Sequence, residues 1–290
     1  MKAQFNTRTA CITCGSANLK KVSDGLFDQG PLHDFLSADP WGESPVPFLA
    51  GKPWAYVQCD CGQRFHKYVL TPEWNDINFS RWMSPEAIAE FERTRGAMKF
   101  ERAAHFVKHT LQLESLIDAR PIRVLDFGCG NGEFLTLCHQ FGFETTGVDR
   151  STARRDKAGH VLASIDELGD RTFHAITLFE VLEHLEEPAT VLATLRKHLL
   201  PGGILILETP DCTGVERIES RHEYDAIHPL QHINGFTPET MRSIAERHGF
   251  KAVSKPVSHV TASPVKVAKT EARRLLGKVL KPTTQQYFTV

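Results

Sequence analysis

Three alternating glycines most constrain how this chain can fold. The segment reads Val124-Leu-Asp-Phe-Gly128-Cys-Gly130-Asn-Gly132, and a helical pattern follows it. The apolar residues predict a buried strand, and the glycines allow a sharp turn and the close approach of a ligand to the backbone. A dinucleotide-binding turn has the spacing G-x-G-x-x-G, whereas this segment has G-x-G-x-G. Asp126 precedes the turn, where it suits a positive ammonium group better than a pyrophosphate.

Apolar runs and helical patterns alternate from residue 121 to residue 249. Strands are predicted at 122–126, 144–149, 161–164, 173–179 and 204–208, and helices at 132–141, 189–200 and 237–248. Such alternation indicates a parallel sheet with helices on both faces. The predicted fold class is therefore α/β, a doubly wound and mostly parallel sheet, joined to a small N-terminal module.

The second predicted strand ends in an acid, Asp149, which lies 17 positions after Gly132. A carboxylate at that strand end can accept two hydrogen bonds from a ribose diol. Together with Asp126, it predicts a site for a nucleoside that carries an amino acid. The alternative is that both acids only cap helices in a domain that binds no nucleotide.

Composition divides the chain into a Cys-rich module at 1–80, a helical lead-in at 84–118, an α/β domain at 119–263 and a tail at 264–290. The formal net charge of −1 gives no strong nucleic-acid signal, because proteins that coat nucleic acid are basic overall. No run of about 18 apolar residues occurs, so no transmembrane segment is predicted. Seven cysteines without an apolar leader fit a reducing compartment, and a cytoplasmic location is expected.

The tail contains a predicted basic helix at 264–281, with six basic residues and one acidic residue. Its apolar residues recur at helical spacing, which is typical of a helix docked on the domain with a solvated basic face. The alternative is a weak contact with an anionic surface, such as lipid headgroups. Residues 285–290 are predicted to form a final strand.

Four ordered motifs over residues 125–210 resemble those of class I S-adenosylmethionine-dependent methyltransferases. They are LDFGCGNGEF at 125–134, TTGVDRS at 145–151, FHAITLFEVLEHL at 173–185 and LPGGILILETP at 200–210. The resemblance implies a seven-stranded Rossmann-like sheet with a final antiparallel strand. It also implies that S-adenosylmethionine binds to Asp126, Phe127, Gly128, Cys129, Gly130, Asp149, Arg150, Phe179 and Glu180. The family usually carries an acid where His174 stands, which we expect to alter local packing.

The third motif also carries the candidate acceptor residues. Its spacing Glu180-x-x-Glu183-His184, with the later His232, resembles ubiquinone-pathway O-methyltransferases and small-RNA 3′-terminal 2′-O-methyltransferases. In both groups the resemblance implies a divalent cation that holds acceptor hydroxyls, here Mg²⁺ at Glu180, Glu183 and His184. Catalytic roles are accordingly predicted for His184, Glu183 and His232. The alternative is a metal-free site in which His184 is a base or a packing residue.

The N-terminal module contains the two cysteine pairs Cys11-x-x-Cys14 and Cys59-x-Cys61. A C-x-x-C knuckle followed by glycine is half of a zinc site, although the second pair is one residue shorter than usual. His66 is therefore an alternative fourth ligand, and four free thiols are the metal-free alternative. Both pairs look like the ends of zinc ribbons that precede some sugar and natural-product methyltransferases, which implies a structural Zn²⁺.

The predicted function is an S-adenosylmethionine-dependent methyltransferase that acts on a hydroxyl of a small molecule or glycan. One alternative is an RNA 3′-terminal 2′-O-methyltransferase that uses a divalent metal. That alternative calls for a basic stripe with aromatic residues, and outside the tail the sequence has none. The other alternative is a non-catalytic zinc-ribbon interaction module on a methyltransferase scaffold.

Overall fold

The structure is a computed structural model that describes residues 1–39, 42–84, 86–87, 90, 96–150, 161–256, 260, 265, 268, 271–272 and 283–290. The chain forms two compact units. Unit 1 comprises Met1–Thr94, Leu182–Thr190 and Thr209–Ile244, and unit 2 comprises Arg95–Val181, Val191–Glu208 and Ala245–Val290. Among the described helices, none is both long and apolar enough to cross a membrane.

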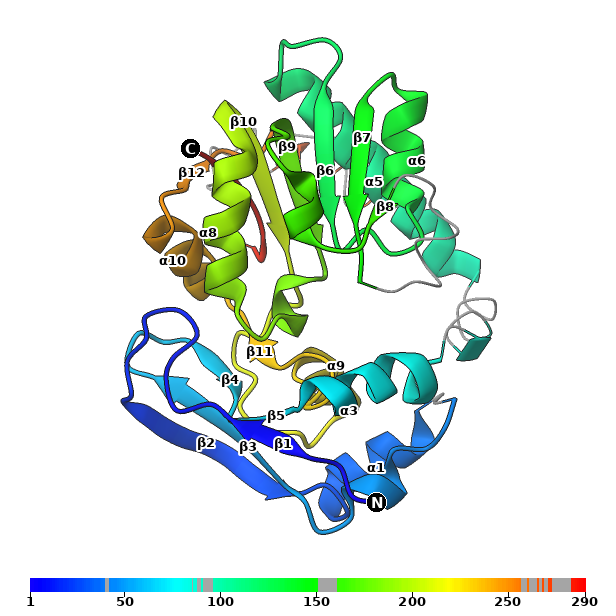
Figure 1. The fold of residues 1–290 in the computed structure, drawn as a ribbon, viewed down its shortest axis with the longest axis vertical. Coiled ribbons are helices and arrows are strands. Elements are labelled where there is room, and N and C mark those ends of the chain that lie inside the picture. The colour runs from blue at the N-terminus through cyan, green and yellow to red at the C-terminus, as the bar shows by residue number, and fades with distance from the viewer. Residues whose placement is uncertain are drawn as a thin grey trace. The chain divides into compact units, whose positions relative to one another are not determined.

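Unit 2 contains a seven-stranded sheet in the order β12-β13-β10-β9-β6-β7-β8. Strands β10, β9, β6 and β7 of this sheet lie side by side in Figure 1. Its strands are β6 (Arg123–Phe127), β7 (Glu144–Val148), β8 (Val161–Leu162), β9 (Phe173–Phe179), β10 (Leu199–Glu208), β12 (Lys251–Val253) and β13 (Gln285–Thr289). The five strands from β10 to β8 pair in parallel, whereas β13 is antiparallel to both of its neighbours. The predicted fold class is thus confirmed, including the antiparallel strand at residues 285–290.

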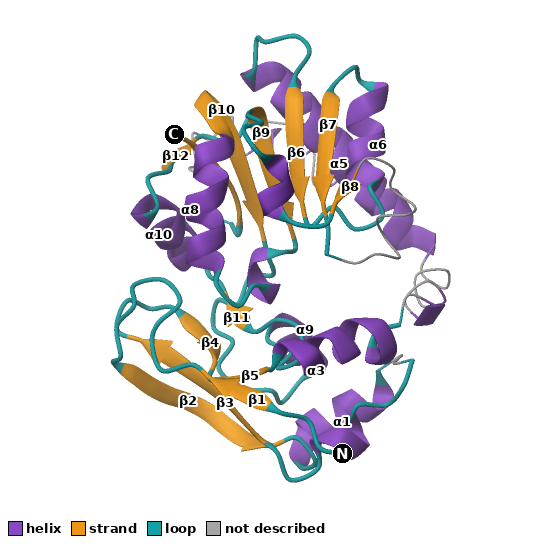
Figure 2. Ribbon diagram, in the orientation of Figure 1, coloured by secondary structure: helices purple, strands orange, loops and turns teal. Residues whose placement is uncertain are grey.

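Helices lie on both faces of this sheet, as Figure 2 shows. They are α5 (Gly96–Leu116), α6 (Glu133–Gln140), η2 (Ile165–Leu168) and α8 (Pro188–His198). Helix α10 (Pro238–Arg247) begins in unit 1 and ends in unit 2. Phe106 and Leu113 of α5 pack with Phe134 of α6 and with strand residues such as Val124 and Ile206. Apolar strands covered on both faces are what a parallel sheet requires.

Unit 1 is built around a four-stranded antiparallel sheet in the order β11-β4-β3-β2, with a separate β1–β5 pair. Its strands are β1 (Phe5–Thr7), β2 (Leu19–Leu26), β3 (Pro53–Cys59), β4 (Arg64–His66), β5 (Tyr68–Leu70) and β11 (Asn234–Gly235). Its helical segments are α1 (Gly30–Ala38), α2 (Val46–Leu49), α3 (Pro72–Ile77), η1 (Asn78–Trp82), η3 (Leu182–His184) and α9 (Arg221–Ala226). Large aromatic residues, among them Tyr56, Trp82 and Tyr224, are fully buried in its core.

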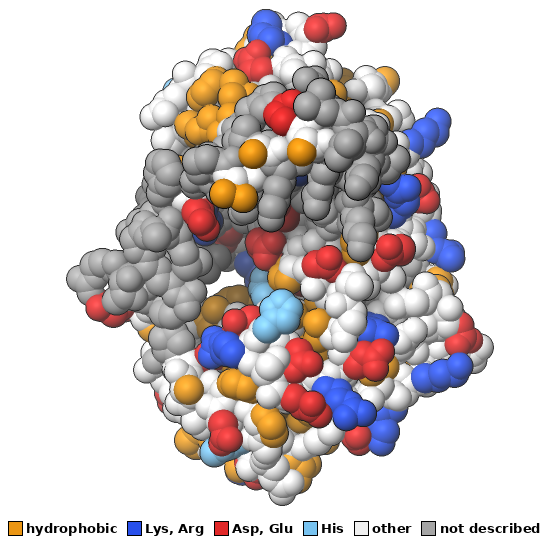
Figure 3. All heavy atoms as spheres, turned by 180° about the vertical axis from the view of Figure 1, so that it is seen from behind, with side chains coloured by type: hydrophobic (Ala, Val, Ile, Leu, Met, Phe, Trp, Pro, Cys, Tyr) orange, Lys and Arg blue, Asp and Glu red, His pale blue; other side chains and the backbone are white. Residues whose placement is uncertain are grey.

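Unit 1 is discontinuous in sequence, whereas the sequence predicts contiguous segments. The reason is strand pairing, because β11 adds Asn234 and Gly235 to the edge of β4. Most of the predicted basic helix at 264–281 lies outside the described residues, so its contacts stay a prediction. Over the described part of the face drawn in Figure 3, acidic and basic side chains are interspersed.

Candidate functional site

The glycine loop between β6 and α6 has the backbone that the sequence predicts. Gly128 and Gly130 have positive φ angles of 76° and 56°, which other residues rarely adopt. A Cβ on Gly128 would collide with the side chain of Val181, whereas a Cβ on Gly130 would meet no atom within 4 Å. The loop therefore turns tightly at Gly128 and leaves open space beside the backbone of Gly130.

Two buried carboxylates lie at the strand ends beside this loop. Asp126 accepts a hydrogen bond of 2.6 Å from the Thr177 hydroxyl, and only 4% of Asp126 is exposed. Burial raises the pKa of Asp126 to about 7, and the nearby Asp149 carboxylate also raises it. Asp149 accepts a hydrogen bond of 2.9 Å from the Gly130 amide. The loop thus carries two acids that could bind an ammonium group and a diol.

The other residues predicted to bind the cofactor differ in exposure. Phe127 is half-buried, Arg150 is exposed and Cys129 is buried. Phe179 packs edge-on against Phe134, with ring centroids 5.0 Å apart. Phe179 therefore contributes to the aromatic packing of the sheet in addition to ending strand β9.

Glu180 has the only positive φ angle among the described non-glycine residues, at 55°. Its amide donates a hydrogen bond of 2.9 Å to the Glu208 carbonyl, which holds the end of β9 beside that of β10. A non-glycine residue in this conformation costs about 1–3 kcal/mol, and such strain concentrates at functional sites. The chain then continues through Val181 into η3.

Within unit 1, Glu183, His184 and His232 form a cluster of possible metal ligands. One ligand atom from each lies within 4.8 Å of the others. His184 Nε2 is 3.8 Å from a Glu183 carboxylate oxygen, and the two imidazole centroids are 4.9 Å apart. The cluster contains His232, which lies far along the chain, and does not include Glu180. We call these three residues the EHH cluster.

Hydrogen bonds fix which nitrogen of His184 faces the EHH cluster. His184 Nδ1 lies 2.8 Å from the Gln231 carbonyl oxygen. Because a carbonyl only accepts, Nδ1 carries a proton, and in the neutral ring Nε2 is the nitrogen without one. This arrangement is typical of a histidine that binds a metal or acts as a base.

His232 completes the EHH cluster with an available nitrogen. Its buried Nδ1 has no hydrogen-bond partner among the described residues. Burial lowers the pKa of His232 well below its usual value, and the neighbouring His184 also lowers it. The ring is thus neutral at ordinary pH, as metal binding requires. Two imidazoles and one carboxylate suit a first-row transition metal better than Mg²⁺, which prefers oxygen ligands.

The four cysteines of the N-terminal module also meet at one point. Cys11 Sγ lies 3.6 Å from Cys61 Sγ, and Cys14 Sγ lies 3.5 Å from Cys59 Sγ. Four sulfurs at about 2.3 Å from one Zn²⁺ would be about 3.8 Å apart, so these distances fit a tetrahedral site. The alternative ligand His66 instead directs Nε2 at the Ile227 carbonyl, 2.8 Å away.

A further pair of histidines in unit 2 belongs to a hydrogen-bond network. His105 Nε2 lies 3.1 Å from Glu208, and His109 Nδ1 lies 2.6 Å from the Tyr287 hydroxyl. The Gln285 amide donates to His109 Nε2 over 3.0 Å and also to Glu208. These contacts match donors with acceptors without a bound cation, so we assign no metal here.

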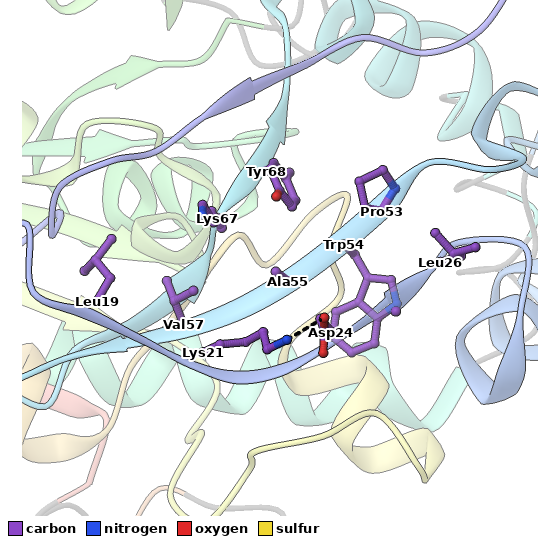
Figure 4. A pocket seen from close by; sticks show the side chains of 11 residues that line it. Leu19, Lys21, Asp24, Leu26, Pro53, Trp54, Ala55, Val57, Lys67 and Tyr68 are labelled. Atoms are coloured by element: carbon purple, nitrogen blue, oxygen red, sulfur yellow. Dashed lines mark hydrogen bonds and ion pairs between the residues drawn. The ribbon is translucent and has the colours of Figure 1, made fainter.

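A pocket of about 500 Å³ lies on the sheet of unit 1, between β2, β3 and the start of β5 (Figure 4). Trp54 and Tyr68 line it, together with an ion pair of 2.9 Å between Lys21 and Asp24. The sequence-predicted site residues do not line this pocket.

A family model and several named proteins match this chain. Residues 99–255, more than half of the chain, match a family model described as a methyltransferase domain. A ubiquinone biosynthesis O-methyltransferase of Rickettsia conorii is 24% identical over 208 residues, covering 66% of this chain and 67% of the relative. A namesake from Alkalilimnicola ehrlichii is 34% identical over 101 residues, covering 30% of this chain and 41% of the relative. The chain thus spans less than half of that second relative.

Two solved structures are also similar to this chain. A methyltransferase from Mesorhizobium loti has a TM-score of 0.44 and 18% identity, covering 61% of this chain and 95% of its own. The plantazolicin methyltransferase BpumL, solved in complex with SAH, has a TM-score of 0.49 and 15% identity, covering 74% and 93%. From the family match and the order of its strands, this chain belongs to the class I S-adenosylmethionine-dependent methyltransferases.

Proposed function

We propose that this methyltransferase transfers the methyl group to a hydroxyl oxygen of a small molecule, and that the EHH cluster receives that hydroxyl. The observation that supports the proposal is the convergence of Glu183, His184 and His232 within 4.8 Å. Glu183 follows the strained Glu180 by three residues, so chain connectivity links the acceptor residues to the end of β9. The curated relatives that we compared are named O-methyltransferases, which supports oxygen as the acceptor atom.

The glycine loop is proposed to bind S-adenosylmethionine. In this proposal Asp149 accepts hydrogen bonds from the ribose diol, and Asp126 attracts the ammonium group of the methionine part. A positive charge next to Asp126 would favour its ionised form and oppose the effect of burial. The remaining proposed contacts come from Phe127, Gly128, Cys129, Gly130, Arg150, Phe179 and Glu180.

Methyl transfer is an in-line displacement, in which the bond from acceptor oxygen to methyl carbon forms as the carbon–sulfur bond breaks. Much of the rate enhancement comes from alignment of the reacting atoms. The proton of the acceptor hydroxyl passes to the lone pair of His184 Nε2. Because Nδ1–H is held by the Gln231 carbonyl, the imidazolium that forms keeps its orientation.

A divalent cation in the EHH cluster would be an alternative to this base, because it would occupy His184 Nε2. It would instead lower the pKa of an acceptor hydroxyl, which would release its proton to solvent. Glu183, His184 and the orphaned Nδ1 of His232 would hold it. This donor set fits Mn²⁺, Fe²⁺, Co²⁺ or Zn²⁺ better than the Mg²⁺ that the motif implies. Separately, we propose that the four-cysteine site holds a structural Zn²⁺, because a closed site of four cysteines leaves no position for substrate.

Two measurements test the proposal. Calorimetry with S-adenosylhomocysteine is expected to show binding by the wild type and by His184→Ala, but a loss of at least tenfold with Asp149→Ala. Methyl transfer to 3,4-dihydroxybenzoate, whose adjacent hydroxyls can chelate one ion, is expected to exceed transfer to 3-hydroxybenzoate and to disappear in His184→Ala. Equal binding by Asp149→Ala would remove the cofactor assignment, and unchanged turnover in His184→Ala would remove the acceptor assignment.

A further inference from the structure

The turn η3, which carries Glu183 and His184, is held by a buried side chain from a distant part of the sequence. Asn234 Nδ2 donates to the Leu182 carbonyl over 3.1 Å and to the Leu185 carbonyl over 2.7 Å. Asn234 is 0% exposed and lies in β11, two residues after His232. One amide group therefore joins the two segments that supply the EHH cluster.

Arg8, the first residue after β1, bridges the same two segments. One guanidinium nitrogen, Nη1, donates to Asn234 Oδ1 over 2.7 Å and to the Ile233 carbonyl over 3.3 Å. The other, Nη2, donates to the Glu186 carbonyl over 3.1 Å and to the Leu185 carbonyl over 3.4 Å. One end of the guanidinium thus holds the segment of His232, and the other holds the segment of Glu183 and His184.

The chemistry of arginine suits this position. A guanidinium is planar and has five donors in a fixed fork, so it can hold two backbone segments at a defined separation. Lysine has a single nitrogen on a flexible stem and cannot reproduce the two-sided contact. Burial lowers the pKa of Arg8 to about 10, and Glu186 and Glu187 oppose that shift, so the group stays charged at neutral pH.

We propose that Arg8 and Asn234 are positioning residues for methyl transfer, which set the separation between His184 and His232. This inference rests on the proposed role of the EHH cluster as acceptor site. It gives the N-terminal module a role in catalysis beyond packing, because the arginine that bridges the two segments directly follows strand β1. A purely structural role would lower stability without moving the two imidazoles relative to each other.

The test compares Arg8→Lys with Arg64→Lys. Arg64 is a matched control, because it is also partly buried in unit 1 and bonds Gln58 Oε1 at 2.9 Å and the Val215 carbonyl at 3.0 Å. The readout is the nuclear Overhauser effect between the His184 and His232 rings, whose centroids lie 4.9 Å apart in the folded chain. It needs neither acceptor nor metal.

We expect the ring-to-ring effect to be lost in Arg8→Lys and retained in Arg64→Lys, with binding of S-adenosylhomocysteine unchanged in both. Mn²⁺ affinity should fall at least tenfold in Arg8→Lys only. Should Arg8→Lys fail to fold, Arg8→Gly supplemented with guanidinium supplies the missing group, and recovery of the ring-to-ring effect supports the proposal.

Two outcomes would overturn the proposal. One is an unchanged ring-to-ring effect in Arg8→Lys, and the other is equal loss in both lysine variants. Failure of the wild type to bind Mn²⁺ would count against the metal in the proposed function, yet it would leave the comparison of ring positions intact. The two failures are therefore distinguishable.

Discussion

Replacing Gly130 by alanine distinguishes two effects: the loss of folding stability through backbone strain and the loss of ligand affinity through steric hindrance. Gly130 has a φ of 56°, and a Cβ there would meet no protein atom within 4 Å. Alanine in the left-handed conformation destabilises the folded state by about 1–2 kcal/mol. Alanine also restricts the unfolded chain, which stabilises the folded state by about 0.4–1 kcal/mol. We expect Gly130→Ala to lower the free energy of unfolding by about 1 kcal/mol.

The effect on ligand binding should be larger, because the methyl group would occupy the space through which a ligand approaches the backbone. We expect the Kd for S-adenosylhomocysteine to rise at least tenfold, which corresponds to about 1.4 kcal/mol. Isothermal calorimetry measures this constant, and urea denaturation measures the stability of the same sample.

Gly142→Ala is the matched control. Gly142 has a φ of 82°, its Cβ would also meet no atom within 4 Å, and it follows helix α6 at the end away from the glycine loop. Both variants should lose similar stability, but only Gly130→Ala should lose affinity. If Gly130→Ala bound S-adenosylhomocysteine as tightly as Gly142→Ala, the loop would not be the ligand site and the cofactor assignments would fall with it.

Three other predictions concern Asp126, His174 and the four-cysteine site. Burial raises the pKa of Asp126 to about 7, so the folded state binds this proton more tightly than the unfolded state. The free energy of unfolding should therefore fall as pH rises from about 4 to 7, by up to about 1.4 kcal/mol per pH unit. Urea denaturation at several pH values should show a smaller pH dependence of the free energy of unfolding for Asp126→Asn than for the wild type. The same pH dependence in both proteins would refute the prediction. His174 Nδ1 accepts the Arg123 amide at 3.0 Å, so His174→Ala should cost about 1 kcal/mol without changing cofactor affinity, while His174→Asp keeps the acceptor. Elemental analysis should find one zinc per four-cysteine site, lost in the double variant Cys11→Ser and Cys14→Ser; a zinc-free wild type contradicts it.

The sheet and the glycine loop could be predicted because their signals are local. The positive φ angles of Gly128 and Gly130 depend on single residues. Buried strands can be recognised as short runs of apolar residues. The antiparallel pairing of the final strand could be expected only from the family resemblance, because the sequence of residues 285–290 does not indicate which strands it pairs with. The packing role expected for His174 agrees with the hydrogen bond it accepts from Arg123.

The proposed acceptor site could be predicted only in part. The family resemblance predicts Glu183, His184 and His232. That His232, and not Glu180, lies beside the other two depends on the pairing of β11 with β4, a contact between residues far apart in the chain. For the same reason, the sequence offered no signal for Arg8 or Asn234. The choice between Cys61 and His66 likewise depended on where the ring of His66 points, and spacing does not determine that direction.

The position of β13 has a consequence for how unit 2 is made. β13 lies between β10 and β12 in the sheet, although it follows both in sequence. A ribosome that has released residues up to β12 therefore holds a chain whose β10 edge is still uncovered and whose β12 has nothing to pair with. Unpaired edges attract other strands. Synthesis of residues 285–289 closes that gap, so until their release the β10 edge is open to pairing with a strand of another chain.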